Sequence, residues 1–380
     1  MSNRTIARIH LPRARQTGTF NLADLRASDQ SLAEFGQQNA LAVLTAQITT
    51  YNNLLNSSMA ALVGMTTERF EGEPIMVGMQ MVDVDEYGNS ATQKGGSSAG
   101  RGYPLLTKQI ATGWTEHFRE MASVAQFVAM NDQAQLAHTQ AIRTELARAF
   151  YTPTERPLTE SLVMGPYVRP EVISGVKVKP LYNGDEETPP VSPNGTVFAS
   201  GHNHYLGSDG LDNAAVEALV QTVGEHSTGN SLIIYINEAD APQFRALPGF
   251  VSATVTQVVG PTTQAQTTVN LDVTQTDDRI IGFTAGGIPV RTKPWAIAGY
   301  AICLNLNGPR ALKMRQPEPV RMRGLRLKGQ EGNTVLQAQT WEATFGFGAS
   351  NRGAAAILNF GPKPDGVPAD QYSAPASLAA

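Results

Sequence analysis

The chain has 380 residues, 41% of them hydrophobic, so it can bury sizeable cores, and its length predicts two or three domains. Its 29 basic and 33 acidic residues give a formal net charge of -4, which argues against a protein that wraps nucleic acid or lies on an anionic membrane. The apolar runs are far shorter than the roughly 20 residues of a membrane-spanning helix. The only cysteine, Cys303, excludes an intrachain disulfide and is expected to be a small buried hydrophobe.

The N-terminal segment is basic. Arg4, Arg8, Arg13 and Arg15 occur before the first acidic residue, Asp24, which predicts an arm instead of a packed element. Such an arm fits a solvated tail and contact with an anionic surface equally well. No apolar stretch typical of a secretory signal follows the arginines, so we expect synthesis in a cytoplasm.

A helix and a long hairpin are predicted next. Apolar residues recur at steps of three and four between Ser31 and Gly64, which indicates a one-sided amphipathic helix that ends near Gly64. The apolar run 74–84, a turn at 85–89 and the glycine-rich segment 94–104 then predict a two-stranded excursion. A lone hairpin is at best marginally stable in water, so this one is expected to lie against something else, for which a neighbouring subunit is one candidate.

The segment between Gly113 and Pro153 contains neither glycine nor proline. Its apolar residues, from Trp114 to Phe150, fall near helical spacing, which predicts a long helix. The middle of that helix is polar on most sides and carries no heptad seam, so we expect a supporting helix and not a coiled coil.

The segment 180–201 is rich in proline, glycine and acidic residues and is a candidate domain boundary. Beyond it, Asp209 or Asp212 is expected to cap a helix over 214–223, followed by a buried strand over 230–236 and a short helix over 238–247. The remainder is predicted to be mostly strand, with alternation over 268–274. Four residues of a later strand share one face: Trp341, Ala343, Phe345 and Phe347.

The stretch GHNHYLGSDG at 201–210 raises the possibility of a metal site, because His202 and His204 point to the same face of an extended segment. A zinc site needs three or four ligands. His226, Asp209 or Asp212 could approach the pair, but no further spacing supports them. We therefore expect no metal and no cofactor: the two histidines hydrogen-bond or stack at a structural turn, with Tyr205 packed inward.

Other catalytic patterns fail on their context. Ser98 sits in a G-x-S-x-G match without a buried strand before it and a helix after it, which a nucleophile elbow requires. The segment that starts at Asp83 begins like a calcium loop but has Lys94 at the twelfth position, where a bidentate acid is needed. No phosphate-binding loop is present in the sequence. We expect no catalytic residue and a protein that is not an enzyme.

Five stretches carry a resemblance to a known family. They are VDVDEYGNSATQKG with YPLLTKQIATGWTEHF, then GHNHYLGSDG, then TKPWAIAGYAICLNL, and finally TFGFGASNRGAAAILNF. In this order the elements resemble a tailed-bacteriophage major capsid protein of the Hong Kong 97 fold. The resemblance rests on order and spacing and not on a single motif.

The resemblance implies an α+β fold with an N-terminal arm, an extended hairpin loop, a peripheral domain with a long spine helix over 115–151, and an axial α/β domain. The implied divisions are the arm (1–30), the N-terminal helix region (31–67), the extended loop (68–105), the peripheral domain (106–200), the axial domain (201–293), the return strands of both domains (294–360) and the C-terminal tail (361–380).

The implied function is a virion capsid subunit that forms pentamers and hexamers, closes an icosahedral shell and encloses double-stranded DNA without reading its sequence. Only about 30 residues precede the first helix, so a separate scaffolding protein is expected, with a portal and a possible decoration protein as further partners. An encapsulin-like cellular compartment is the second hypothesis. A metal-dependent hydrolase using His202 and His204 is the third.

Under the capsid hypothesis, several residues are candidates for contacts between subunits: Arg4, Arg8, Arg13, Arg15, Asp83, Asp85, Glu86, Tyr87, Lys94, Arg101, His202, His204 and Tyr205.

Overall fold

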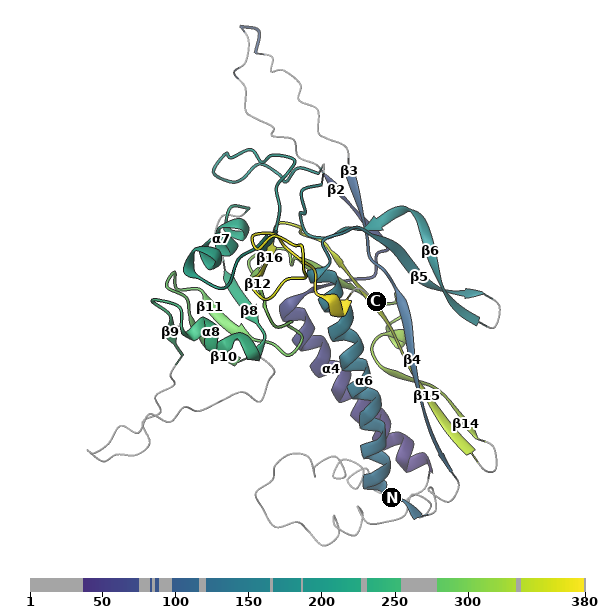
Figure 1. Ribbon diagram of the computed structural model, residues 1–380. Coiled ribbons are helices and arrows are strands. Elements are labelled where there is room, and N and C mark those ends of the chain that lie inside the picture. The colour runs from purple at the N-terminus through teal and green to yellow at the C-terminus, as the bar shows by residue number, and fades with distance from the viewer. Residues whose placement is uncertain are drawn as a thin grey trace, which may run out of the picture.

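The computed structural model describes residues 37–74, 83, 86–88, 98–115, 121–164, 167–185, 187–226, 231–253, 279–332 and 336–378. Within these ranges, two long helices lie side by side, a five-stranded and a seven-stranded sheet form the body, and two hairpins project from it (Figure 1). None of the helices found there combines the length and the apolar character needed to cross a membrane.

Helix α4 (Gln37–Leu62) confirms the amphipathic helix predicted over 31–64. Leu44 and Leu62 are buried, and Tyr51 packs against the same core, whereas Leu54 is 67% exposed on the opposite face. The helix ends at Leu62, two residues before Gly64, where strand β1 (Gly64–Thr66) begins. The 3.6-residue period alone located this element.

The long helix is shorter than its glycine-free segment predicted. Residues 106–115 form strand β4 (Leu106–Thr115), and helix α6 spans Val124–Tyr151. Ser123 begins the helix through a capping box, because its hydroxyl accepts from the Gln126 N–H while the Gln126 side chain accepts from the Ser123 N–H. The expected spine over 115–151 is therefore wrong at its N-terminal end.

Strand β4 exists because it has a distant partner. It pairs antiparallel with β15 (Leu336–Ala349) over ten residues, from Leu106 opposite Phe345 to Thr115 opposite Leu336. β15 also pairs with β13 (Leu312–Arg315) and with β14 (Arg326–Gly332), and β13 pairs in parallel with β1. The long strand β15 is therefore the centre of the five-stranded sheet.

The face that was predicted on β15 is confirmed. Trp341, Ala343, Phe345 and Phe347 are each at most 3% exposed and belong to one core, which they share with residues of α4 and α6 such as Leu146. Burying large aromatic side chains contributes roughly 1.5–3 kcal/mol each, so this face holds the two long helices against the sheet.

The seven-stranded sheet has the order β7–β16–β12–β8–β11–β10–β9. In chain order its strands are β7 (Tyr205–Gly207), β8 (Leu232–Ile236), β9 (Val251–Ser252), β10 (Arg279–Phe283), β11 (Pro289–Thr292), β12 (Tyr300–Asn305) and β16 (Ala355–Asn359). Two helices accompany it, α7 (Asn213–Gly224) and the short α8 (Ala241–Arg245).

This sheet is buried on both faces at its centre. In β8, Ile233 and Tyr235 join the core that contains α4 and α6, whereas Ile234 and Ile236 join a second core with residues of α7 such as Leu219. Successive strand side chains point to opposite faces, which explains this division. The α/β unit predicted from 209–247 is confirmed, with Asp212 as the cap whose side chain accepts from the Ala215 N–H at 2.7 Å.

Two antiparallel hairpins leave the body (Figure 1). One consists of β2 (Phe70–Pro74) and β3 (Ser98–Gly102), the other of β5 (Arg156–Met164) and β6 (Tyr167–Val178). The first is the base of the hairpin predicted from the sequence. Most of its outer part, the N-terminal arm and the strand predicted over 268–274 lie outside the described residues.

Candidate functional sites

Twelve of the thirteen predicted contact residues fall into three groups, and the thirteenth, His202, is partly buried. Six lie outside the described residues: Arg4, Arg8, Arg13, Arg15, Asp85 and Lys94. Asp83, Glu86 and Tyr87 are exposed between β2 and β3, with Tyr87 at 80%. That these three residues contact a neighbouring subunit stays a prediction.

The third group lies inside the chain. Arg101 on β3 is 6% exposed, His204 is fully buried and Tyr205 is 3% exposed. The Tyr205 hydroxyl lies 3.1 Å from the Phe150 carbonyl oxygen, which fastens β7 to the end of α6. The inward packing predicted for Tyr205 is confirmed. Because the chain itself buries these three side chains, we do not carry them forward as contact residues.

The base of the β2–β3 hairpin is held by a buried carboxylate. Glu160 on β5, 3% exposed, accepts from Arg69 Nε at 2.8 Å and from Arg69 Nη2 at 2.9 Å, and also from Arg315 Nη1 on β13. Burial alone would raise the pKa of Glu160, but the hydrogen bonds and charges of Arg315 and Arg69 outweigh it and lower that pKa. The ionised carboxylate thus joins both hairpins to the five-stranded sheet.

A second set of contacts fixes the same hairpin. Lys313 Nζ lies 2.7 Å from both carboxylate oxygens of Glu71, and the Tyr103 hydroxyl donates to Glu71 at 2.9 Å. Charged hydrogen bonds of this kind are stronger than neutral ones. The hairpin therefore leaves the body in a fixed direction.

Large apolar side chains are exposed on these projecting elements. Phe70 on β2 is 57% exposed and Val172 on β6 is 64% exposed, in addition to Tyr87. Scattered exposed apolar residues are normal on a monomer. Their place on hairpins that extend from the body makes them surfaces that a neighbouring subunit can cover.

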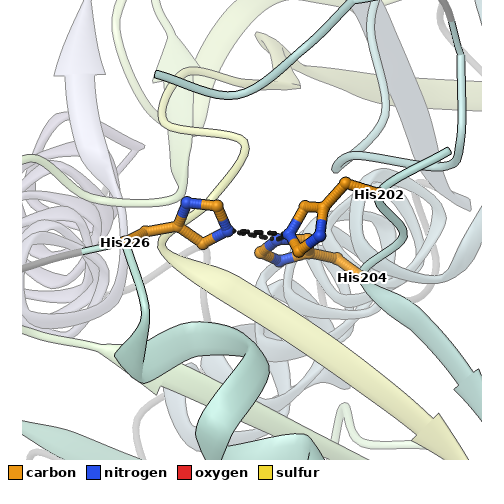
Figure 2. Close-up of side chains that lie close together, drawn as sticks. All are labelled: His202, His204 and His226. Carbon is orange, nitrogen blue, oxygen red and sulfur yellow. Dashed lines mark hydrogen bonds between the residues drawn. The ribbon is translucent and has the colours of Figure 1, made fainter. Parts of the chain in front are cut away.

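A cluster of three histidines lies next to the seven-stranded sheet. His202 and His204 precede β7, and His226 follows the end of α7. Figure 2 shows the three rings with one nitrogen of each turned toward a common point. The Nε2 atoms of His202 and His204 are 3.0 Å apart, and each lies 2.9 Å from Nε2 of His226. The sequence pointed to the pair and only raised the third residue as possible.

The surroundings of the histidine cluster are largely aromatic. The Phe198 ring lies 4.6 Å from those of His202 and His226, and the Tyr182 ring lies 5.6 Å from that of His204. Burial lowers the pKa of each histidine, that of His226 to about 4. All three imidazoles are therefore neutral near pH 7, which is the form that binds metals.

No family model matches the chain, and no curated protein does either. Among solved structures, a chain of Mycobacterium phage Patience is similar at 20% identity with a TM-score of 0.61, over 96% of this chain and 96% of that one. A capsid chain of a native GTA particle is similar at 14% identity, TM-score 0.46, over 80% and 90%. An encapsulin of Synechococcus elongatus is similar at 10% identity, TM-score 0.39, over 83% and 89%.

Of these three similarities, only that to the Mycobacterium phage Patience chain is close enough to establish a fold. It spans nearly the whole of both chains. The order of the elements agrees with it: a first helix, a projecting hairpin, a long helix, an α/β unit and returning strands. The expected α+β architecture is confirmed, and the chain has the Hong Kong 97 fold.

Proposed function

We propose that this chain is the major capsid protein of a tailed bacteriophage with a double-stranded DNA genome. The observation that carries the proposal is the firmly anchored β2–β3 hairpin, which extends from a body with this fold and carries exposed apolar residues (Figure 1). A two-stranded hairpin gains little stability from its own contacts, so its natural place is against another molecule.

The proposed subunits form pentamers and hexamers that close an icosahedral shell. Closed shells repeat the same heterologous contacts around rotation axes, and a projecting hairpin on one subunit fits a surface on the next. In this arrangement the unit built on the seven-stranded sheet faces the fivefold and sixfold axes. The β2–β3 hairpin reaches over the adjacent subunit.

The function is mechanical and not catalytic. The shell encloses the genome without reading its sequence, which agrees with a net charge of -4. A separate scaffolding protein, a portal and a possible decoration protein complete the proposed set of partners. An encapsulin-like compartment is the alternative, and it would enclose protein cargo instead of DNA.

A truncation of the hairpin tests the proposal. Pro74 and Ser98 are opposite each other in the β2–β3 ladder, so an Asn-Gly turn can replace residues 75–97 without changing the register. The expected product is a folded subunit, with the circular dichroism spectrum of the full chain, that forms no closed particles in electron micrographs.

In a second variant, a Gly/Ser segment as long as residues 75–97 replaces those residues. It separates the loss of side-chain contacts from the shortening of the hairpin. The proposal expects both variants to fail in assembly. Closed particles of normal size from the Asn-Gly variant would refute the role assigned to the hairpin, and particles filled with protein instead of DNA would favour the compartment.

A further inference from the structure

The histidine cluster cannot be satisfied by hydrogen bonds within itself. Each Nε2 atom either carries a proton and donates or lacks one and accepts. Three atoms that approach one another at 2.9–3.0 Å form three contacts, and with two possible states at least one contact joins two donors or two acceptors. In a buried cluster such a mismatch is costly. The arrangement therefore lacks a partner at the point where the three nitrogens converge.

The protonation of His204 shows what kind of partner fits. Its Nδ1 lies 2.6 Å from the Ala355 carbonyl oxygen, which only accepts, so Nδ1 carries the proton. The neutral ring then presents the lone pair of Nε2 to His202 and His226. Histidines that bind metals commonly donate their other ring N–H to a backbone carbonyl, which fixes the ring and its tautomer. His204, fully buried in the chain, has this arrangement.

The distances fit a tetrahedral ion. Around Zn²⁺, with Zn–N bonds of about 2.0–2.1 Å, tetrahedral nitrogens lie about 3.3–3.4 Å apart. The observed separations of 2.9–3.0 Å differ from this by a few tenths of an ångström. Small side-chain rotations remove that difference.

A carboxylate is placed to complete the coordination. Glu225 Oε1 lies 3.4 Å from His202 Nε2 and 4.0 Å from His226 Nε2. Glu225 and His226 also follow the C-terminal end of α7, where the helix dipole favours a positive charge. Three imidazoles and one carboxylate are a normal ligand set for zinc, whereas Ca²⁺ and Mg²⁺ require oxygen ligands.

One nearby positive charge would oppose a cation, and it is compensated. Arg352 lies with its guanidinium 4.5 Å from the centre of the Tyr182 ring, which borders the cluster. Its Nη1 and Nη2 atoms donate to Glu187 and Asp185, each at 2.6 Å. The two carboxylates therefore neutralise Arg352 locally, so that the cluster does not face an unpaired positive charge.

We propose that His202, His204 and His226, with Glu225 as fourth ligand, bind one Zn²⁺ ion that fastens the end of α7 to the segment preceding β7. The site is structural, because its fourth position is closed by a protein carboxylate and the rings of Phe198 and Tyr182 cover it. Zinc then joins three parts of the chain, since His204 is held in turn by Ala355 on β16. The inference concerns the subunit alone and does not rest on the proposed function.

Metal analysis of the full-length chain, purified without a histidine tag or chelator, is the first test. We expect about one Zn²⁺ per chain by inductively coupled plasma mass spectrometry. After removal of the metal, added Co²⁺ is expected to give the intense visible absorption of a tetrahedral site. Zn²⁺ added to the stripped chain is expected to raise its Tm by about 5 °C or more.

Substitutions test whether the metal binds at this place. His202→Ala and His226→Ala are expected to weaken Zn²⁺ binding by about 100-fold or more and to abolish the Co²⁺ absorption. His138→Asn is the matched control, because His138 is also buried but contacts Tyr51, away from the cluster. It is expected to bind Zn²⁺ as the unmodified chain does.

Either of two results would overturn the site. One is an unmodified chain that neither retains Zn²⁺ nor develops the tetrahedral Co²⁺ spectrum. The other is metal binding that persists unchanged in both cluster variants. If a variant does not fold, the Co²⁺ spectrum of the unmodified chain still decides, because a six-coordinate or absent spectrum excludes a tetrahedral site of three histidines and a carboxylate.

Discussion

Glu160 on β5 accepts two hydrogen bonds from the guanidinium of Arg69, at 2.8 Å from Nε and 2.9 Å from Nη2, and so ties the start of one projecting hairpin to the other. Arg315 on β13 donates to the same carboxylate from the five-stranded sheet. A single buried side chain therefore contacts both hairpins and the five-stranded sheet.

Removal of this carboxylate is expected to destabilise the subunit strongly. Glu160→Ala leaves Arg315, 7% exposed, without its anionic partner, and the loss is expected to be about 3–5 kcal/mol in the free energy of unfolding. Urea denaturation of unassembled subunits measures this loss. The contribution of Glu160 is also expected to fall as the pH is lowered, because its pKa is lowered by folding and the carboxylate is stabilised only while ionised.

An exposed ion pair is the control for Glu160. The Lys177 side chain is 65% exposed where it meets Glu155, so Lys177→Ala is expected to change the free energy of unfolding by at most about 1 kcal/mol. Equal losses from Glu160→Ala and Lys177→Ala would show that burial of the Glu160 network has no energetic consequence.

A glycine in the central strand β15 is required by close packing. A Cβ atom at Gly346 would collide with the backbone carbonyl of Pro104, whereas one at Gly100 on β3 would meet no atom within 4 Å. Gly346→Ala is therefore expected to cost roughly 1–3 kcal/mol or more, because the backbone cannot move aside easily. Gly100→Ala is expected to stay within about 0.5 kcal/mol. Thermal unfolding of both variants measures the difference. Similar Tm values for the two variants would contradict the close packing at Gly346.

His138 on α6 is expected to make the subunit sensitive to acid. It is 5% exposed, its Nδ1 lies 3.0 Å from the Tyr51 hydroxyl, and burial lowers its pKa to about 4. An unfolded chain binds a proton to this histidine below about pH 6.5, so stability is lost as the pH falls from there toward 4. The free energy of unfolding is expected to drop by about 2–3 kcal/mol between pH 7 and 4.5 on this account.

His138→Gln isolates that contribution, because glutamine does not titrate and all other groups remain. The variant is expected to lose less stability than the unmodified chain over the same pH range, measured by urea denaturation. Tyr51 does not interfere, since burial raises its pKa further from this range. Parallel pH profiles for the two chains would contradict the prediction.

The basic arm is expected to act in assembly or in genome retention. Arg4, Arg8, Arg13 and Arg15 lie outside the described residues, and we propose that they face packaged DNA or an acidic groove on a neighbouring subunit. Replacing all four with Gln is expected to lower the fraction of assembled subunits or the nucleic acid content of the particles. Particles with unchanged assembly and unchanged nucleic acid content would exclude a role of the four arginines in contacting either DNA or a neighbouring subunit.

Elements with local signals were predictable from the sequence. The 3.6-residue period located α4, and the apolar alternation identified the face of β15. Asp209 or Asp212 was expected to begin α7, and the structure shows Asp212 in that position. Each of these signals depends on neighbours within one or two turns of helix or one strand, so the chain alone contains it.

Elements that depend on distant partners were not predictable. Trp114 fits the helical spacing of the segment after Gly113, but pairing with β15, more than 200 residues later, makes it part of strand β4. In the same way, His226 joins His202 and His204 only because α7 brings the chain back to β7. The role of Glu160 has no signal in the sequence, because its partners are distant in the chain: Arg69 precedes β2 and Arg315 lies on β13.

Electron microscopy of the purified full-length chain, over a series of salt and protein concentrations and with size-exclusion chromatography alongside, tests the central claim most directly. The account predicts closed shells, or tubes and rings of five or six subunits, under at least part of the series. A small discrete oligomer under every condition would contradict the proposal that this chain is a capsid subunit.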